Sequence, residues 1–470
     1  MNQEYLKLFK NQEEYDAAAT KPVVSHLIEE VEIIMESGCD VTTTYELVGT
    51  PTYPSTIECD ESSFNLSFNY RKTIINEDCS QAITEGSETA TIQVGENPYT
   101  SSTRTIEGTY YYHGLEIQYS LVQNKCRLAI IGTFDITDTE NPTKVAYSVN
   151  SFTEIEIDGI KQSSMTTGYT FSTVGEHTVK YYLYNNYMGY STFYGCNRLI
   201  DVIIPNGVNT ITSQAFQYCT NLESIELPDS ITTISNSAFT SCHKLESATI
   251  PNSVTYVGEC AFWYCQALTS CTMSTSATYI GKECFYFCTG LTSIDLPSGL
   301  TTISSQLFKS CTNLKRVNSD VDGEVNIPSG VTSIEPGAFG TCVSIKSISI
   351  PDTVTSIGDS AFAYCGLIDI VVPDGVTVIS FGFINSSSSL TGITFGNSVT
   401  SVKGNAFNGC TSLRRITITT PTAPATEQWT FYTMSRGGTL YVPAGSSGYE
   451  AWMSSGSYNL GTYGWSKVEI

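Results

Sequence analysis

The sequence is poor in basic residues. It has 23 Lys and Arg against 46 Asp and Glu, which gives a formal net charge of −23 at pH 7. An acidic surface repels nucleic acids and anionic membranes, so we expect neither as a partner. The chain also lacks any run of about 18 apolar residues, and residues 1–18 have no basic start followed by an apolar core. The sequence therefore predicts no membrane insertion and no usual export signal.

Histidine is scarce, and the motifs of several large enzyme classes do not occur. The four histidines are scattered through the chain, and none forms a HExxH or CxxC…HxxxH pattern: His26, His113, His177 and His243. GxSxG, GxxxxGK[ST] and a strand-linked GxGxxG do not occur either. We therefore expect no enzyme, no cofactor and no metal centre.

What the sequence has instead is a 23-residue period. Six phenylalanines are spaced by 23, and each has a cysteine three residues later: Phe193, Phe216, Phe239, Phe262, Phe285 and Phe308. After an eight-residue insertion at 319–326, the pattern continues with Phe339/Cys342, Phe362/Cys365 and Phe407/Cys410. Phe383 marks a weaker copy, with Ser386 in the cysteine place. About ten such copies indicate a solenoid.

Each copy predicts a short strand followed by a tight turn. In Leu222–Pro228 the apolar residues Ile225 and Leu227 flank an outward Glu226, and proline ends the strand. Coils stacked in register place like residues about 4.8 Å apart, so the cysteines form a ladder. That spacing is within disulfide reach, but side chains in register point the same way and nine cannot pair without a leftover. We favour reduced, buried thiols. Bridges among Cys39, Cys59, Cys79 and Cys126 stay an open alternative.

The repeat resembles the BspA-type leucine-rich repeat. Residues 347–365, SISIPDTVTSIGDSAFAYC, match its consensus nearly letter for letter, and the resemblance covers about 186–418. Residues 419–470 resemble the C-terminal cap of that family, with Thr439–Gly445, Tyr449, Trp452 and Trp465. The resemblance implies a surface or secreted recognition protein of gut Bacteroidetes, of protists or of phages that infect such bacteria. It implies no enzyme.

The residues before the repeats predict three further parts. Residues 1–40, with a capping box at Asn11 and Glu14, form an N-terminal docking segment. Residues 41–128 alternate strands and turns, as in an Ig-like β-sandwich. Their end, at 104–108 and 115–123, resembles the closing strands of BACON domains. Residues 129–185 form a small β unit that shields the solenoid's open end. The predicted fold class is thus mainly β, a sandwich followed by a solenoid.

Candidate ligand-binding residues lie between the repeat phenylalanine and cysteine. They are aromatic: Tyr218, Trp263, Tyr264, Tyr286, Phe287 and Tyr364. Contiguous aromatics on a rigid scaffold favour recognition of a sugar or a protein, although they can equally pad the turn. The exposed strand positions offer a rival surface: Glu226, Thr249, Thr272, Asp295, Ser349, Val371, Thr394 and Thr417. The acidic insertion Asp320–Glu324 is predicted to be a solvated loop rather than a calcium site.

Two functions follow. The first is a non-enzymatic recognition protein on a Bacteroidetes phage particle, of fibre or decoration type, which binds a cell-surface protein or glycan and contacts other virion proteins through residues 1–40. The opening at residues 5–26 is similar to such phage proteins, and free thiols suit folding in a reducing cytoplasm. The alternative is a BspA-like bacterial adhesin, extracellular or on the cell surface, whose export signal is absent from this sequence. The oligomeric state is left open.

Overall fold

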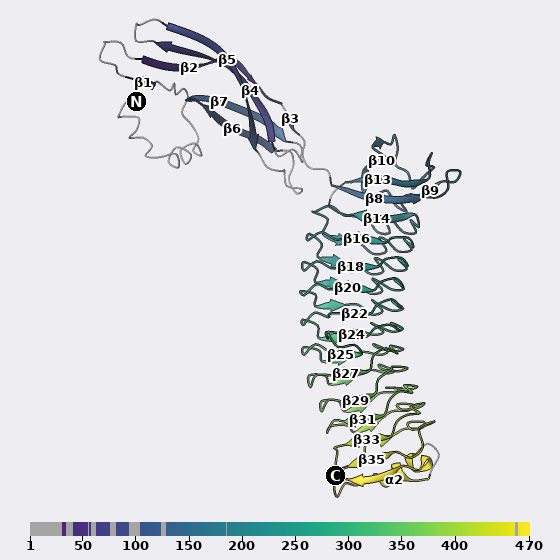
Figure 1. Cartoon of the computed structure of the whole chain (residues 1–470). Helices are drawn as coiled ribbons and strands as arrows, with labels where there is room; N and C mark the ends of the chain where they lie inside the picture. Colours follow the sequence, from purple (N-terminus) through teal and green to yellow (C-terminus); the bar gives the residue numbers. More distant parts are fainter. Residues whose placement is uncertain are drawn as a thin grey trace. The chain divides into compact units, whose positions relative to one another are not determined.

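The chain folds almost entirely into β-structure. The computed structural model describes residues 31–33, 41–54, 56–57, 63–75, 81–93, 104–123, 128–184, 186–455 and 459–470. It separates into two compact units, Met1–Arg127 and Leu128–Ile470 (Figure 1). Within the described residues the helices are α2 (Glu450–Met453) and the 3-10 helix η1 (Leu460–Tyr463), of four residues each. The prediction of a mainly β chain with a solenoid is confirmed.

The first unit consists of two sheets that share a core. One sheet has the order β1 (Val31–Ile33), β2 (Val41–Thr52), β4 (Ser63–Ile75) and β5 (Gln81–Gln93), and the other β3 (Thr56–Ile57), β7 (Leu115–Gln123) and β6 (Arg104–Tyr112). Phe64, Leu66 and Phe68 alternate along β4 and are buried with Ile117 of β7. The two sheets therefore face each other. The Ig-like and BACON resemblances stay predictions. Apart from β1, the predicted docking segment 1–40 lies outside the described residues, as do the four N-terminal cysteines.

The second unit starts with a sheet that continues into the first coil. Its order is β11 (Ile160–Lys161), β10 (Phe152–Ile157), β13 (Gly175–Leu183), β8 (Ala129–Ile136), β14 (Leu199–Ile203) and β16 (Ser224–Glu226). β8 runs antiparallel to β14, the first strand of the solenoid. Tyr181 packs against Phe193 at a ring-centroid distance of 5.0 Å, and its hydroxyl donates a hydrogen bond to the Val145 carbonyl. This sheet thus covers both the edge and the core of the first coil.

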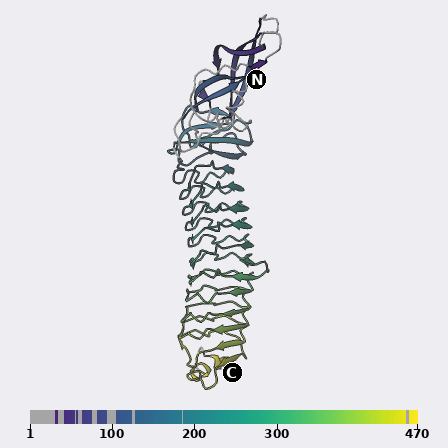
Figure 2. The same ribbon diagram turned by 90° about the vertical axis from the view of Figure 1, so that its left-hand side faces the viewer.

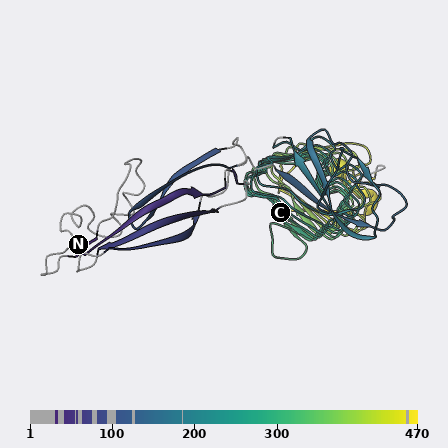
Figure 3. The same ribbon diagram turned by 90° about the horizontal axis from the view of Figure 1, so that it is seen from above.

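Each coil contributes short strands to two sets of parallel pairings, a long and a short ladder. Figure 1 labels strands of the long ladder, Figure 2 shows the same stack of coils from the side, and a view along the stack shows the coils superposed (Figure 3). The long ladder runs through three successive sheets. The first ends at β16. The second comprises β18 (Ser247–Thr249), β20 (Ser270–Thr272), β22 (Ser293–Ile294), β24 (Arg316–Val317), β25 (Glu324–Asn326) and β27 (Ser347–Ser349), and the third β29 (Asp369–Val371), β31 (Gly392–Phe395), β33 (Arg415–Ile418), β35 (Thr439–Val442) and β36 (Ser466–Glu469). The short ladder also runs through three successive sheets. The first comprises β15 (Thr210–Ile211), β17 (Thr233–Ile234), β19 (Tyr256–Val257) and β21 (Tyr279–Ile280), the second β23 (Thr302–Ile303), β26 (Ser333–Ile334) and β28 (Ser356–Ile357), and the third β30 (Val378–Ile379), β32 (Ser401–Val402) and β34 (Ala425–Thr426).

The repeat phenylalanines form a stack inside the coils. From Phe193 to Phe362, successive rings lie 5.2–5.9 Å apart, centroid to centroid, and all are fully buried. A single coil has no second layer to cover its phenylalanine. Stacking supplies that cover, which is why the period must persist over many coils.

The ladder cysteines have a specific hydrogen-bonding role. The thiol of each one from Cys219 to Cys410 donates to the backbone carbonyl at the phenylalanine place of the preceding coil, at 2.9–3.3 Å. Burial raises the pKa of the Cys365 and Cys410 thiols to about 12, from an ordinary value of 9.0. These thiols are therefore neutral donors at physiological pH, which gives the cysteine ladder a purpose other than disulfide formation.

One coil departs from the predicted phase. The backbone N–H of Phe362 bonds to the carbonyl of Phe383, whereas that of Phe339 bonds to Ala361, so Phe383 occupies the alanine place. Ile384 takes the phenylalanine place, and Ser387 donates to the Phe362 carbonyl as a cysteine would. The assignment of Ser386 to the cysteine place is therefore wrong by one residue. The cause is a missing residue after Cys365, where Gly366 alone precedes Leu367.

The solenoid also differs from the predicted range at two places. β24 and β25 pair through Val317 and Val325 alone, while β23 pairs directly with β26, so the insertion adds one rung to the long ladder only. Beyond residue 418, β35 and β36 continue the parallel ladder, and Phe431 stacks on Phe407 at 6.0 Å. The repeats therefore form about twelve turns rather than ten, and part of the predicted cap region is itself coiled.

Candidate functional site

The candidate aromatics lie on a turn with unusual backbone geometry. The second residue after the phenylalanine place has a left-handed conformation in successive coils, with φ of 62° at Tyr218, 62° at Tyr264, 58° at Phe287 and 58° at Tyr364. This conformation costs a non-glycine residue about 1–2 kcal/mol. Its backbone N–H bonds to a carbonyl of the next coil, as from Tyr264 to Tyr286 at 2.8 Å. The stack thus fixes the turn and holds the side chain at the surface.

Four of the six predicted residues come together in two adjacent coils. The Trp263 and Tyr286 rings are parallel within 4° at 6.1 Å, and Tyr264 meets Phe287 edge-on at 5.5 Å. Trp263 also stacks on Tyr264 at 5.2 Å. All four side chains are half-buried. We call these four residues the aromatic tract. Their rings pack on one another and keep part of their surface exposed.

A second group lies at the start of the solenoid, and the sequence analysis found only one member of it. Tyr218 meets Tyr194 edge-on at 5.4 Å, and Tyr194 lies 5.2 Å from Tyr147. The ammonium nitrogen of Lys144 sits 4.6 Å from the centre of the Tyr147 ring and 5.5 Å from that of Tyr194. Tyr194 directly follows Phe193, so the period could have revealed it. Tyr147 and Lys144 precede the repeats and have no such signal.

Tyr364 stands apart from both groups. Its side chain is 55% exposed, and its flanking coils carry glycine, threonine, asparagine and serine at the same turn positions: Gly340, Thr341, Asn385 and Ser386. Between the two groups, the turn residues Thr240 and Ser241 are small and buried. The six predicted residues thus divide into a tract of four, one member of a second group and one isolated tyrosine.

The rival surface on the long ladder is exposed in part. Glu226, Thr249, Thr272, Asp295, Ser349 and Val371 are exposed, whereas Thr394 and Thr417 are half-buried. The short ladder carries a further aromatic pair that was not predicted, Tyr256 and Tyr279, whose rings stack at 5.0 Å. These faces are otherwise built mainly from small polar side chains.

The acidic insertion is engaged in ion pairs rather than shaped as a cation site. The Asp322 carboxylate lies 3.5 Å from Arg316 and 3.8 Å from Lys315, and Glu324 accepts a hydrogen bond from Ser319. Across the described residues, no group of three or more His, Cys, Asp or Glu side chains is arranged to hold a metal ion.

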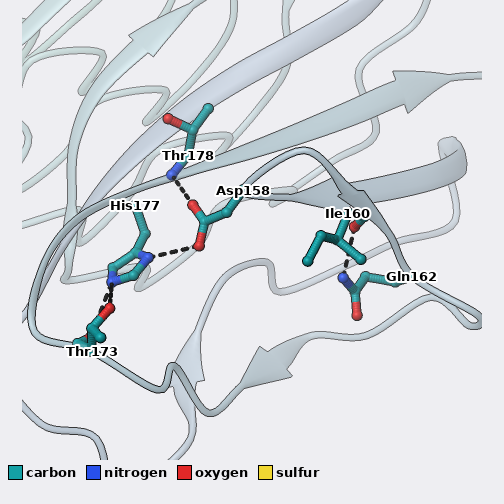
Figure 4. Close-up of polar contacts among 6 residues, drawn as sticks. All are labelled: Asp158, Ile160, Gln162, Thr173, His177 and Thr178. Atoms are coloured by element: carbon teal, nitrogen blue, oxygen red, sulfur yellow. Dashed lines mark hydrogen bonds and ion pairs between the residues drawn. The ribbon is translucent and has the colours of Figure 1, made fainter.

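One histidine lies in a hydroxyl–imidazole–carboxylate arrangement (Figure 4). His177 Nδ1 is 2.7 Å from Asp158 Oδ2, while Nε2 is 3.2 Å from Thr173 Oγ1 and 3.0 Å from the Thr173 carbonyl oxygen. Asp158 lies in the β10–β11 turn and also accepts a hydrogen bond from the Thr178 N–H, at 3.0 Å. Because the carbonyl competes with the hydroxyl for Nε2, the cluster acts as a clamp that ties two turns to β13. We assign it a structural role.

The comparisons with known proteins define the class of this chain. The family described as the BspA type leucine rich repeat region, with six copies, matches residues 186–315 and 322–435, just over half of the sequence. The chain therefore belongs to the BspA-type leucine-rich repeat family. The comparison with curated proteins finds no match.

Solved structures of bacterial leucine-rich repeat proteins are similar to parts of the chain. One from Bacteroides ovatus is 21% identical, with a TM-score of 0.41. The match covers 64% of this chain and 90% of the Bacteroides protein. A leucine rich cell surface protein from Faecalibacterium prausnitzii is 27% identical, with a TM-score of 0.35. The match covers 57% of this chain and 78% of that protein. The pneumococcal vaccine antigen PcpA is 21% identical, with a TM-score of 0.38. The match covers 52% of this chain and 63% of PcpA. In the described residues no helix is long and apolar enough to cross a membrane.

Proposed function

We propose that the protein is a non-enzymatic recognition module whose solenoid binds a cell-surface protein or glycan. The observation that supports this most is the aromatic tract, where four large side chains are held at the surface by left-handed turns that inter-coil hydrogen bonds fix. Rigid aromatic side chains lose little conformational entropy on binding and bury a large area, which makes them effective contact residues.

The cysteine ladder supports a binding role rather than a catalytic one. A nucleophilic cysteine needs a lowered pKa and access to substrate. Here burial raises the pKa of each described ladder thiol, and the side chains are at most 3% exposed. The histidine beside one of them, His243, contacts Tyr264 with its ring instead.

For the location, we propose the particle of a Bacteroidetes phage, with residues 1–40 contacting other virion proteins; the bacterial cell surface is the alternative. The similarity of residues 5–26 to phage proteins supports the first. The buried thiols fit either location, because burial protects them from oxidation as well as from reaction. Immunogold labelling of purified particles and of intact cells separates the two. Particles that lose the protein when residues 1–40 are deleted would support the docking role, whereas unchanged incorporation would contradict it.

A binding assay on candidate cells tests the recognition role. The variant Trp263→Ser, Tyr264→Gly, Tyr286→Ser removes most of the aromatic tract, and glycine at 264 suits the left-handed backbone. We expect it to keep the fold by circular dichroism and to lose most of its cell binding. Tyr364→Gly is the matched control, since it removes an exposed aromatic outside the tract from an equivalent turn, and it should bind like the parent. Undiminished binding by the triple variant would transfer the role to the strand face.

A further inference from the structure

The edge of the solenoid that bears the aromatic tract is free of acidic residues. We define the turn edge as the five residues after each phenylalanine place from Phe193 to Phe407, or four after Phe362, where a residue is missing. No Asp or Glu occupies any of these positions, although the chain has 46 of them. The ionisable side chains that do occur there, besides cysteine and tyrosine, are basic or histidine: Arg198, His243, Lys244 and Lys309. Most carboxylates of the coils follow later in each repeat, such as Glu226 on β16 and Asp295 after β22, although Glu223 lies 3.4 Å from Lys244 at the border of the turn edge.

Two lysines lie at the ends of the two aromatic groups, and Lys309 donates a hydrogen bond to the neutral Gln306 Oε1 at 3.1 Å. Lys309 sits 5.7 Å from the centre of the Tyr286 ring, and Lys144 lies over Tyr147 and Tyr194. Within the described residues neither forms an ion pair, whereas Lys161, Lys180, Lys244 and Lys282 each have a carboxylate within 4 Å. A side chain at Gly195 would come within 3.3 Å of the Lys144 nitrogen, so glycine there leaves room for it.

The remaining turn-edge positions add a row of hydroxyl and amide groups. In the coils from Phe193 to Phe308, the two positions after each cysteine carry mostly such residues: Asn197, Thr220, Asn221, Gln266, Thr289, Thr312 and Asn313. Each of these coils has at least one of them except the Phe239 coil, where His243 and Lys244 take both positions. A row of this kind suits a linear ligand with its own repeat, because most units of the ligand meet similar chemistry.

We propose that the turn edge from Tyr194 to Lys309, together with the adjoining Lys144 and Tyr147, binds a carboxylated polysaccharide. This inference rests on the recognition role proposed above and names its ligand class. Sugar rings have C–H faces for the aromatic groups and hydroxyls for the amide row, and the sugar carboxylates are attracted to Lys144 and Lys309. On a chain of net charge −23, an edge whose own positions hold no Asp or Glu, with two lysines that form no ion pair among the described residues, is a surface at which an anionic partner meets reduced repulsion.

The test uses the intact protein and pairs of polysaccharides that differ only in charge. Polygalacturonate, hyaluronan and polysialic acid are each compared with their carboxyl-reduced forms by surface plasmon resonance at two salt concentrations. Polyglutamate serves as a carboxylate chain without sugar. The double variant Lys144→Met, Lys309→Met removes the charges but keeps the aliphatic stems. Lys346→Met is the matched control, because Lys346 is an exposed lysine outside the turn edge and forms no ion pair among the described residues.

We expect at least one acidic polysaccharide to bind more tightly than its reduced form, with an affinity that falls as salt rises. The double variant should lose roughly threefold to tenfold, which corresponds to two exposed charge contacts. Lys346→Met should bind like the parent.

Three results would overturn the proposal: equal binding of acidic and reduced forms, equal binding of polyglutamate, which would indicate an acidic protein partner, or no binding of any chain. If cells still bind through the aromatic tract in those cases, the recognition role stands and only the ligand class fails. If the triple aromatic variant binds cells like the parent, the recognition role through the tract fails instead.

Discussion

At the scale of single residues, each coil depends on one buried ring and one buried thiol. Phe285 lies between Phe262 at 5.6 Å and Phe308 at 5.8 Å, so it contributes to two interfaces between coils. Cys288 donates its thiol to the Phe262 carbonyl, which joins the same two coils. The residues that define the period are therefore those that hold neighbouring coils together.

Truncating a stacked ring should strongly destabilise the solenoid. We expect Phe285→Ala to lower the free energy of unfolding by ~3–5 kcal/mol, because it leaves a cavity that rigid coils above and below cannot fill. Urea denaturation followed by circular dichroism measures the loss. Tyr286→Ala, next to it on the surface, is the control and should cost less. A loss below ~1 kcal/mol for Phe285→Ala would contradict the role of the stack.

The thiol ladder predicts alkaline destabilisation. Burial raises the pKa of Cys365 to about 12 in the folded chain, while the unfolded chain keeps a value near 9.0. Below pH 9 both states hold the proton and stability is complete. Between pH 9 and 12 only the unfolded state releases it, so the free energy of unfolding falls as pH rises. Urea midpoints from pH 7 to 11 should decline above pH 9. Cys365→Ala should flatten that decline slightly, and an unchanged slope would contradict the mechanism.

At the scale of elements, the left-handed turn should tolerate glycine better than branched residues. Tyr364 has φ of 58° and is 55% exposed, so its backbone can be tested with little loss of packing. We expect Tyr364→Gly to be at least as stable as the parent and about 1–2 kcal/mol more stable than Tyr364→Val. Thermal unfolding of both variants measures the difference. Equal stability of the two would show that the stack does not impose this conformation.

The shortened coil gives a second test at this scale. A Cβ atom at Gly366 would lie 2.0 Å from the Val343 carbonyl oxygen, a backbone atom that cannot move aside. We expect Gly366→Ala to lower the free energy of unfolding by about 1–3 kcal/mol, as overpacking does. The control is a glycine with room for a Cβ atom. Gly437 has that room, but its positive φ would add backbone strain. Gly299→Ala therefore serves as control, because its Cβ would lie 3.6 Å from the nearest atom. An equally stable Gly366→Ala protein would contradict the placement of the missing residue directly after Cys365.

The period could be predicted from the sequence because stacking requires the same residue at the same place in every coil. The missing residue could also be found in the sequence, since only one residue separates Cys365 from Leu367, where other copies have two. It is easily overlooked because Phe383 resembles a repeat phenylalanine. The candidate aromatics could be placed on the turn, and the period alone makes Trp263 and Tyr264 neighbours of Tyr286 and Phe287 in the next coil, as the structure has them. How the rings meet depends on side-chain orientation on a left-handed backbone, and Tyr147 and Lys144 arrive from outside the period.

At the scale of the whole molecule, the solenoid needs a cover at its start. Parallel ladders leave backbone groups unpaired at an open edge, and such an edge invites pairing with another chain. β8 pairs with β14, while Tyr181 and Phe152 pack on Phe193. The sheet of β8, β10 and β13 therefore stabilises the solenoid, although its sequence does not follow the 23-residue period.

Two truncations separate this cover from the rest of the chain. Removing residues 1–127 deletes one compact unit and leaves Leu128–Ile470 intact, so we expect a monomer with unchanged thermal stability of the repeats. Removing residues 1–185 also deletes β8 to β13, which uncovers the β14 edge and one side of Phe193. Each coil depends chiefly on its neighbours, so the remote coils should still fold, but the first should fray. We expect a lower unfolding midpoint and self-association that grows with concentration, measured by circular dichroism and by light scattering at two concentrations. If the shorter chain stays monomeric with an unchanged midpoint, the first coil is stable without its cover, and the sheet has another role.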